Sequence, residues 1–282
     1  MEKVPSFDGD LFRGALRVDQ LVSEISGEIV RRMQGITGIT ITTPRSIYDV
    51  LHEIVSPFGD RVRTLTLSLK PEEVFLPLNP EDDQVSPHLE TLKEKGTLSS
   101  EGKTLISAFL LRRLLEVAES RRLVVQLMLG VTRPVAGASP PDYALVEFNP
   151  SQLRYLTQVF ARFREVNFDL LVADPLLHHA SAVIAKNYQN VYLTGYWWYS
   201  LYPEVMNAIL RLRPEMLPYT KVGAFFSDAY VADWMIGKIQ LAKRVLWNVL
   251  SELVRAGFLD PELALEVAEA TLKENQRRLY GL

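Results

Sequence analysis

Cysteine is absent from the 282 residues of the chain, and histidine occurs only four times. Without thiols the protein can form neither a disulfide framework nor a thiolate metal site. A metal site built from three or four imidazole ligands would need nearly every histidine at the end of a strand. The available chemistry therefore rests mainly on carboxylates, guanidinium groups and aromatic rings.

Other absences exclude further classes of protein. No segment has the spacing G-x-G-x-x-G or that of a P-loop, which removes the common phosphate-binding loops. The net charge of −3 and a pI near 5.9 offer no basic surface for nucleic acid. The start, "MEKVPSFDGD", lacks the pattern of a signal peptide, and no apolar run reaches the length of a membrane span. We therefore expect a cytoplasmic protein with neither a nucleic-acid nor a membrane partner.

Short apolar segments alternate with helical patterns along the chain, which predicts an α/β protein with a parallel sheet. Counting gives seven or eight strands, mostly each followed by a helix, and this favours a (β/α)₈ barrel. We predict one barrel domain over residues 1–282. This barrel would be distorted or lack some elements, and it would carry an extra C-terminal helix. A polar, Pro- and Gly-punctuated excursion is predicted at 79–103. The predicted strands include GITITT (38–43), LVVQLMLG (123–130), FDLLVAD (168–174) and VGAFF (222–226).

The residues that follow the predicted strands are candidates for a site, because barrel enzymes place their active sites at the carboxyl ends of the strands. Carboxylates, two arginines and an aromatic cluster would converge there. Such a group suits a small polar or anionic ligand, with aromatic faces available for a sugar-like ring. The main candidates are Asp8, Asp10, Arg45, Arg133, Asp174, Trp197, Trp198 and Asp228.

Each candidate also has a structural interpretation. Asp228 stands between a strand and a helix and would serve equally well as a helix cap. Asp174 precedes a proline, which is a common helix start and favours capping over chemistry. The pair Trp197–Trp198 would equally act as a packing plug. Adjacent histidines point about 100° apart on a helix, so His178–His179 are expected to be solvated or to support other residues rather than share a metal.

The C-terminal half resembles a known family. The segments "VYLTGYWWY", "VGAFFSDAYVADWMIGK" and "ENQRRLYGL" resemble the uronate (glucuronate) isomerase family, within the metal-dependent amidohydrolase superfamily. Upstream, "ITTPRSIYDVL", "LTLSLKPEEVF" and "LVVQLMLGVTRP" resemble further segments of that family. The match covers roughly residues 36–282 and is most specific from Val191 onward. The chain looks like a shortened and divergent member.

The resemblance implies roles for several residues. Asp228 matches the metal-binding aspartate of the eighth strand and is a catalytic candidate. Arg133 matches a substrate-binding arginine and is the second catalytic candidate. Trp197 and Trp198 match the tandem tryptophans of the substrate wall. Two further residues, Arg45 and Tyr230, stand at substrate-facing positions where the family has other residue types.

The departures from the family concern the metal. Met128 stands in place of a histidine, and Asp10 and Phe12 occupy the positions of the first-strand His-x-His pair. The family implies a divalent ion, Zn²⁺, Mg²⁺ or Mn²⁺, but without these histidines a tightly bound zinc is not expected. Asp10, Asp174 and Asp228 would together form an oxygen-ligand site for Mg²⁺ or Mn²⁺.

Three hypotheses follow for the function. In the first, the protein is an aldose–ketose isomerase acting on a sugar acid, with a degenerate metal site. In the alternative, it is a non-catalytic barrel that binds a small carboxylate or a protein partner. The second alternative is a metal-dependent hydrolase of the same superfamily. Members of the family often associate through outer helices, so a homo-oligomer is also an expectation.

Overall fold

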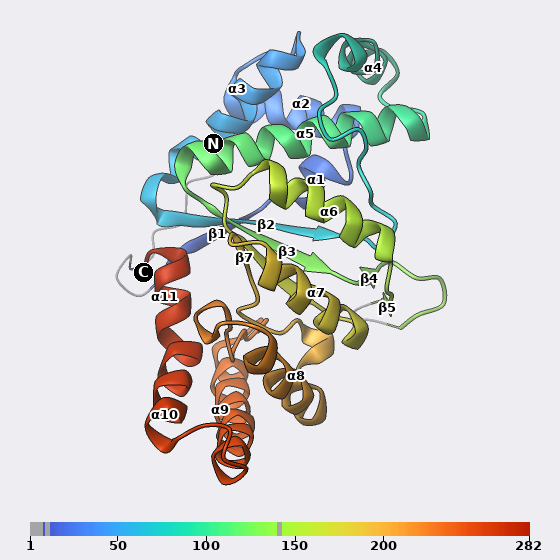
Figure 1. Ribbon diagram of the computed structural model, residues 1–282. Helices are drawn as coiled ribbons and strands as arrows, with labels where there is room; N and C mark the ends of the chain where they lie inside the picture. The colour runs from blue at the N-terminus through green and yellow to red at the C-terminus, as the bar shows by residue number, and fades with distance from the viewer. Residues whose placement is uncertain (1–7, 9–11, 140–142) are drawn as a thin grey trace. The chain divides into compact units, whose positions relative to one another are not determined.

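The computed structural model describes residue 8, residues 12–139 and residues 143–282 (Figure 1). Its central element is a parallel sheet of five strands in the order β1-β2-β3-β6-β7. Within the described residues this sheet does not close into a barrel. The predicted α/β class and the predicted distortion of the (β/α)₈ pattern are confirmed. The strands are β1 (Gly14–Arg17), β2 (Val62–Leu69), β3 (Val124–Leu129), β6 (Phe168–Val172) and β7 (Val191–Tyr192).

Two predicted strands are wrong. The segment GITITT at 38–43 is irregular, although Ile41 is buried. The segment VGAFF at 222–226 contributes only an isolated parallel bridge between Leu193 and Val222. Alternating β-branched residues predicted the first strand, and a run of apolar and small residues predicted the second. In neither case does enough of the segment find hydrogen-bonding partners to continue a ladder.

The chain divides into two compact units, each described by itself. The first comprises Met1–Leu67, Glu72–Val125 and Pro150–Val166, and the second comprises Ser68–Pro71, Gln126–Asn149 and Asn167–Leu282. A single domain over residues 1–282 stays a prediction.

Helices dominate the first unit. In it α3 and α5 pack together, as do α2 with α3 and α4 with α5. Their shared core contains Val50, Leu51, Leu89, Leu92 and Phe109. The helices are α1 (Asp19–Val22), α2 (Gly27–Thr37), α3 (Pro44–Val55), the 3₁₀ turn η1 (Ser56–Arg61), α4 (Asp82–Lys95), α5 (Ser100–Arg121) and α6 (Pro150–Arg162).

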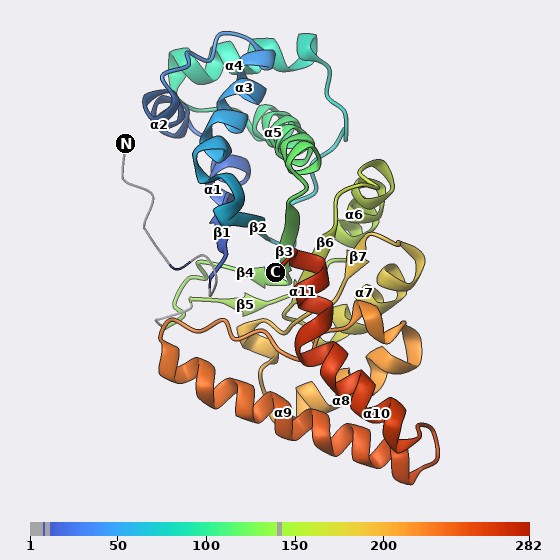
Figure 2. The ribbon, with the colours of Figure 1, turned by 90° about the vertical axis from the view of Figure 1, so that its left-hand side faces the viewer.

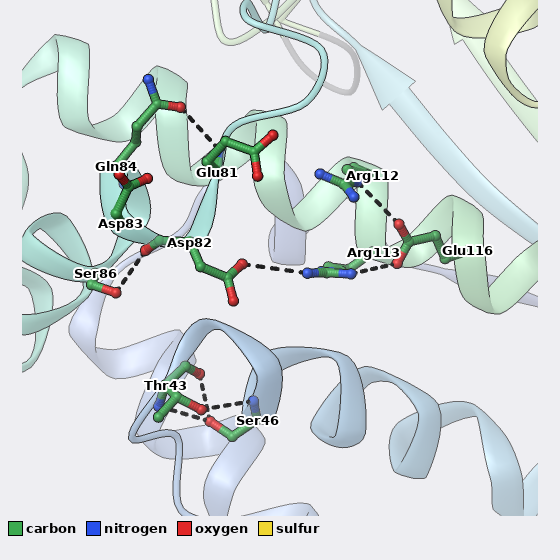
Figure 3. Close-up of polar contacts among 10 residues, drawn as sticks. All are labelled: Thr43, Ser46, Glu81, Asp82, Asp83, Gln84, Ser86, Arg112, Arg113 and Glu116. Atoms are coloured by element: carbon green, nitrogen blue, oxygen red, sulfur yellow. Dashed lines mark hydrogen bonds and ion pairs between the residues drawn. The ribbon is translucent and has the colours of Figure 1, made fainter.

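The segment at 79–103, predicted as a polar excursion, contains α4. One face of this helix carries the buried side chains Val85, Leu89 and Leu92. Its first turn contacts α5 through an ion pair between Asp82 and Arg113, which belongs to a small network on α5 (Figure 3). Arg113 lies 3.5 Å from Asp82 and 2.8 Å from Glu116, which also contacts Arg112 at 3.0 Å. The polar composition of the segment therefore reflects a half-buried helix.

In the second unit, helices pack around the ends of β6 and β7. Helix α9 contacts α8 and α10, and Figure 2 shows the three side by side. The long loop predicted before residue 150 contains a small hairpin, β4 (Val131–Thr132) and β5 (Leu145–Val146). The helices are α7 (Pro175–Asn187), the 3₁₀ turns η2 (Trp198–Ser200) and η3 (Tyr219–Lys221), α8 (Pro203–Met216), α9 (Ala232–Arg255), α10 (Pro261–Glu269) and α11 (Asn275–Tyr280).

A π-helical turn, η4 (Ala270–Glu274), joins α10 to α11. Within it the carbonyl oxygen of Thr271 accepts hydrogen bonds from the backbone N–H of Ala224 (2.9 Å) and from Nε2 of Gln276 (2.9 Å). Next to it, Nδ2 of Asn275 donates to the carbonyl oxygens of Tyr219 and Val222 at 2.6 and 2.8 Å. The turn and its neighbour thus fasten the C-terminal helices to the segment that precedes Asp228.

None of the helices in the described part of the chain combines the length and the apolar character that a membrane span requires.

Candidate functional site

The candidate site of the second unit begins at a small apolar cluster near the ends of β3 and β6. Its buried members are Met128, Val131, Leu171, Ala173 and Trp197, and Trp198, Tyr199 and Phe226 pack against them. Met128, at the position of a family histidine, is therefore a packing residue here. The cluster brings together residues from the segments after β3, after β7 and before Asp228.

Arg133 and Trp197 lie against each other in this cluster. The guanidinium carbon of Arg133 is 5.8 Å from the centroid of the Trp197 ring, a cation–π distance. Trp197 is buried and contacts Tyr199 edge-on, with 5.5 Å between ring centroids. Trp197 accordingly packs as a plug, and the half-buried Arg133 lies beside its ring.

A second group, here called the tryptophan–lysine cluster, consists of Trp198, Trp234 and Lys238. The rings of Trp198 and Trp234 are tilted by 34° with centroids 6.2 Å apart. The ammonium nitrogen of Lys238 lies 4.6 Å from the Trp198 centroid and 5.9 Å from that of Trp234. Trp234 is 47% exposed, so aromatic surface and a cation face solvent together. Tyr230, 83% exposed, meets Trp234 edge-on at 6.3 Å.

Asp228 lies in the turn that leads into α9, and its φ of +41° is in the left-handed region. Helix α9 begins at Ala232 with Val231 as its N-cap and without a side-chain capping bond. The alternative that Asp228 caps this helix is therefore wrong. Its carbonyl oxygen accepts a hydrogen bond from Lys238 at 3.1 Å. Burial lowers the pKa of Lys238, and the nearby Asp228 carboxylate opposes that shift.

The three predicted oxygen ligands do not assemble into a described metal site. Asp174 caps α7, accepting a 2.7 Å hydrogen bond from the backbone N–H of Leu176. Asp10 lies outside the described residues. Within 12–139 and 143–282, together with residue 8, no group of three or more His, Asp or Glu side chains could hold an ion. The described donor set thus does not fit the metal that the resemblance implies.

Arg45 belongs to the first unit. It is exposed in the first turn of α3, where Thr43 is the N-cap and exchanges hydrogen bonds with Ser46 (Figure 3). The predicted contact between Arg45 and a ligand stays a prediction.

Around the buried Asp169 lies a set of side chains that we call the carboxylate network, consisting of Asp169, Thr194, Tyr280 and Gln126. Asp169 accepts hydrogen bonds from the backbone N–H of Thr194 (2.9 Å), from the Thr194 hydroxyl and from the Tyr280 hydroxyl. Gln126 donates to the Tyr280 oxygen at 2.7 Å. Burial raises the pKa of Asp169, and the hydrogen bonds from Thr194 and Tyr280 oppose that rise. Burial and the adjacent Asp169 both raise the pKa of Tyr280.

A second buried set, the arginine network, centres on Arg213. This fully buried side chain donates to the carbonyl oxygens of Leu193 (3.1 Å), Gly195 (3.1 Å) and Gly223 (3.3 Å). A Cβ at Gly223 would collide with backbone of the neighbouring segment, so glycine permits this close approach. Burial lowers the pKa of Arg213, while Tyr196 and Asp169 oppose that shift.

His178 completes the arginine network. Nδ1 accepts from Arg213 at 3.5 Å and Nε2 lies 3.1 Å from the Ser200 hydroxyl, which donates to the carbonyl oxygens of Val172 and Ala173. Burial, helped by the Arg213 charge, lowers the pKa of His178 to about 2. His178 is therefore a neutral structural link, and the Ser200 hydroxyl, already committed to carbonyls, does not serve as a nucleophile.

Comparison with known proteins reveals the fold most clearly. No protein-family model matches the chain, and no curated protein does. Among the solved structures that match along most of it are three isomerases. A uronate isomerase from Bacillus halodurans is 22% identical (TM-score 0.74, 96% of this chain and 59% of that one). A uronate isomerase from Thermotoga maritima is 18% identical (TM-score 0.80, 94% of this chain and 60% of that one). A glucuronate isomerase from Caulobacter crescentus is also 18% identical (TM-score 0.83, 95% of this chain and 58% of that one).

The chain has the fold of these uronate isomerases. The resemblance found in the sequence is confirmed at this level, and the chain spans about three fifths of the length of the structures it matches. At 18–22% identity the likeness concerns the fold alone.

Sequence reasoning missed several residues that the structure brings forward. Trp234 and Lys238 are four residues apart, hence on one face of α9, and this spacing was the available signal. For Asp169, the signal was a carboxylate within an apolar strand. Such a group is expected to be buried and therefore to need hydrogen-bonding partners. Nothing in the sequence indicated that Tyr280 and Arg213 supply the hydrogen bonds of the two networks.

Proposed function

We propose that the protein binds a sugar acid at the surface formed by Arg133, Trp198, Trp234 and Lys238. The observation that carries this proposal is the pairing of cations with tryptophan rings next to the ends of β3 and β7. A guanidinium donates two parallel N–H bonds to a carboxylate, and the apolar face of a sugar ring packs on an aromatic ring. The fold shared with three uronate isomerases supports this ligand class.

Within this proposal Arg133 receives the carboxylate. It is half-buried, its guanidinium lies against the Trp197 ring, and it directly follows strand β4 of the small hairpin. A guanidinium with a restricted rotamer loses less entropy on binding than a free surface arginine. The exposed Trp234 and half-buried Trp198 then offer the wall on which the ring of the ligand rests.

Calorimetry with D-glucuronate and D-galacturonate tests the binding. We expect Arg133→Ala to lower affinity about tenfold or more, because a charged hydrogen bond contributes about 1.5–3 kcal/mol. The matched control is Arg244→Ala, which removes an exposed arginine of α9 and should leave affinity unchanged. Absence of binding by the unaltered protein at millimolar ligand, or equal affinity in both variants, would contradict the proposal.

The second candidate is aldose–ketose isomerisation of the same ligand, favoured by the fold of the three isomerases. The reaction needs a base to move a proton between adjacent carbons and an electrophile to stabilise the enediolate. We assign the role of base to Asp228. The described carboxylates do not form a group that fits a metal.

Turnover separates the isomerase from the non-catalytic alternative. The assay follows ketose formation from glucuronate with Zn²⁺, Mg²⁺ or Mn²⁺ added in turn. If the protein is an isomerase, Asp228→Asn should abolish turnover while glucuronate still binds. Binding without turnover under every ion would favour the non-catalytic barrel. The hydrolase alternative and the homo-oligomer stay predictions.

A further inference from the structure

Lys238 has an unusual set of contacts for a half-buried lysine. Its ammonium donates to the carbonyl oxygens of Ser227 (2.6 Å) and Asp228 (3.1 Å), which are consecutive in the chain. Two tryptophan faces flank the same nitrogen. Two of the three N–H donors of the ammonium are thus committed to one turn of the backbone, ten residues earlier in the sequence.

The turn that receives these bonds has a backbone conformation that surrounding groups must hold. Asp228 has φ +41°, a conformation that non-glycine residues adopt seldom and keep where the surroundings hold it. Lys238, in the second turn of α9, bonds to both carbonyl oxygens of this turn and is one of the groups that hold it.

We propose that Lys238 is a positioning residue that fixes the turn carrying Asp228 and thereby keeps the sugar-acid site in its binding geometry. The consequence for affinity rests on the proposed function. The effect of Lys238 on the turn is independent of the proposed function, because it concerns only contacts within the second unit. Removal of the ammonium releases both carbonyls, and Asp228 then relaxes from the left-handed conformation.

Three variants test this role. Lys238→Met keeps an apolar stem against the tryptophans and removes the charge. Lys238→Arg keeps the charge and donors. Lys243→Met removes an exposed lysine from the same helix and is the matched control. The readouts are hydrogen–deuterium exchange of amides 227–231 and the affinity for D-glucuronate by calorimetry, each compared at equal thermal stability.

We expect Lys238→Met to accelerate exchange at 227–231 at least tenfold and to weaken glucuronate binding at least tenfold. Lys238→Arg should restore most of both properties, and Lys243→Met should alter neither. Unchanged exchange in Lys238→Met overturns the proposal, as does faster exchange with unchanged affinity. If the unaltered protein does not bind glucuronate, the proposed function fails, and the exchange result alone decides whether Lys238 holds the turn.

Discussion

The second unit contains polar side chains of two kinds, which differ in what their hydrogen-bonding groups contact. In the carboxylate and arginine networks, charged groups are fully buried and meet donors or acceptors of the protein itself. In the tryptophan–lysine cluster, a cation and a half-exposed aromatic ring stand beside solvent. Burying an ionic group costs free energy that protein partners must offset. The interior charges therefore serve the fold, whereas the cluster at the strand ends keeps surface free for a ligand.

The largest effect that would test this contrast concerns Arg213. Arg213→Met leaves three carbonyls and the buried Asp169 without their cation, and we expect a loss of about 3–5 kcal/mol in the free energy of unfolding. Arg211→Met, on the same helix but exposed beside Glu252, should cost less than about 1 kcal/mol. Urea denaturation measures both. Similar losses in the two variants would remove the distinction between interior and surface arginines.

Tyr280 tests the carboxylate network. Tyr280→Phe keeps the ring and deletes one donor to Asp169, so the free energy of unfolding should fall by about 1–3 kcal/mol. Tyr202→Phe alters a tyrosine whose side chain is mostly exposed and should leave it unchanged. Equal stability of Tyr280→Phe and the unaltered protein would show that the network contributes nothing to folding.

His178 gives the contrast a pH dependence. The pKa of His178 is about 2 in the folded protein and 6.5 in its ordinary state. Between these pH values the unfolded chain binds a proton at His178, and the folded protein does not. Its contribution to stability is present above pH 6.5 and is lost as pH falls, by about 1.4 kcal/mol per pH unit. His178→Gln offers similar hydrogen bonds without titrating and should flatten this slope. His179→Gln, which changes the exposed neighbour, should retain it.

The smallest expected effect on stability lies at the cluster. Trp234→Leu should change the free energy of unfolding by less than about 0.5 kcal/mol, because the ring is half exposed. If the proposed function holds, the same variant should weaken glucuronate binding roughly threefold, the size of one aromatic contact. Trp247→Leu, at an exposed tryptophan farther along α9, should affect neither quantity. A stability loss without an affinity loss would place Trp234 with the interior groups.

The fold class was predictable because alternating apolar strands and amphipathic helices are local signals. The failures at 38–43 and 222–226 have a common physical cause: a local apolar or β-branched pattern favours an extended backbone, but a ladder needs a partner at the right register. Likewise the polar residues of 79–103 concealed α4, because Val85, Leu89 and Leu92 form only a narrow apolar face.

The sequence indicated which strand ends carry candidate residues, but it did not indicate how their side chains are arranged. Arg133 and Trp197 do lie together, and Asp174 caps a helix as its position before proline indicated. The role of Lys238 depends on a turn whose shape no local pattern encodes. Tyr280 reaches Asp169 across 111 positions of sequence, a separation at which single-sequence periodicity carries no information.

The π-helical turn at Ala270–Glu274 has a consequence for how the sequence tolerates change in length. Such turns hold one residue more than an α-helical path would, and each helical residue advances the side-chain direction by about 100°. Deleting one residue of this turn would therefore leave an α-helical path and keep the side chains of α11 close to their present directions. A one-residue deletion within α10 would instead rotate every side chain of α11 by about 100°, so that Asn275 would leave its two carbonyls and Tyr280 would swing away from Asp169. The turn is thus the place where these C-terminal helices can lose a residue without losing their contacts.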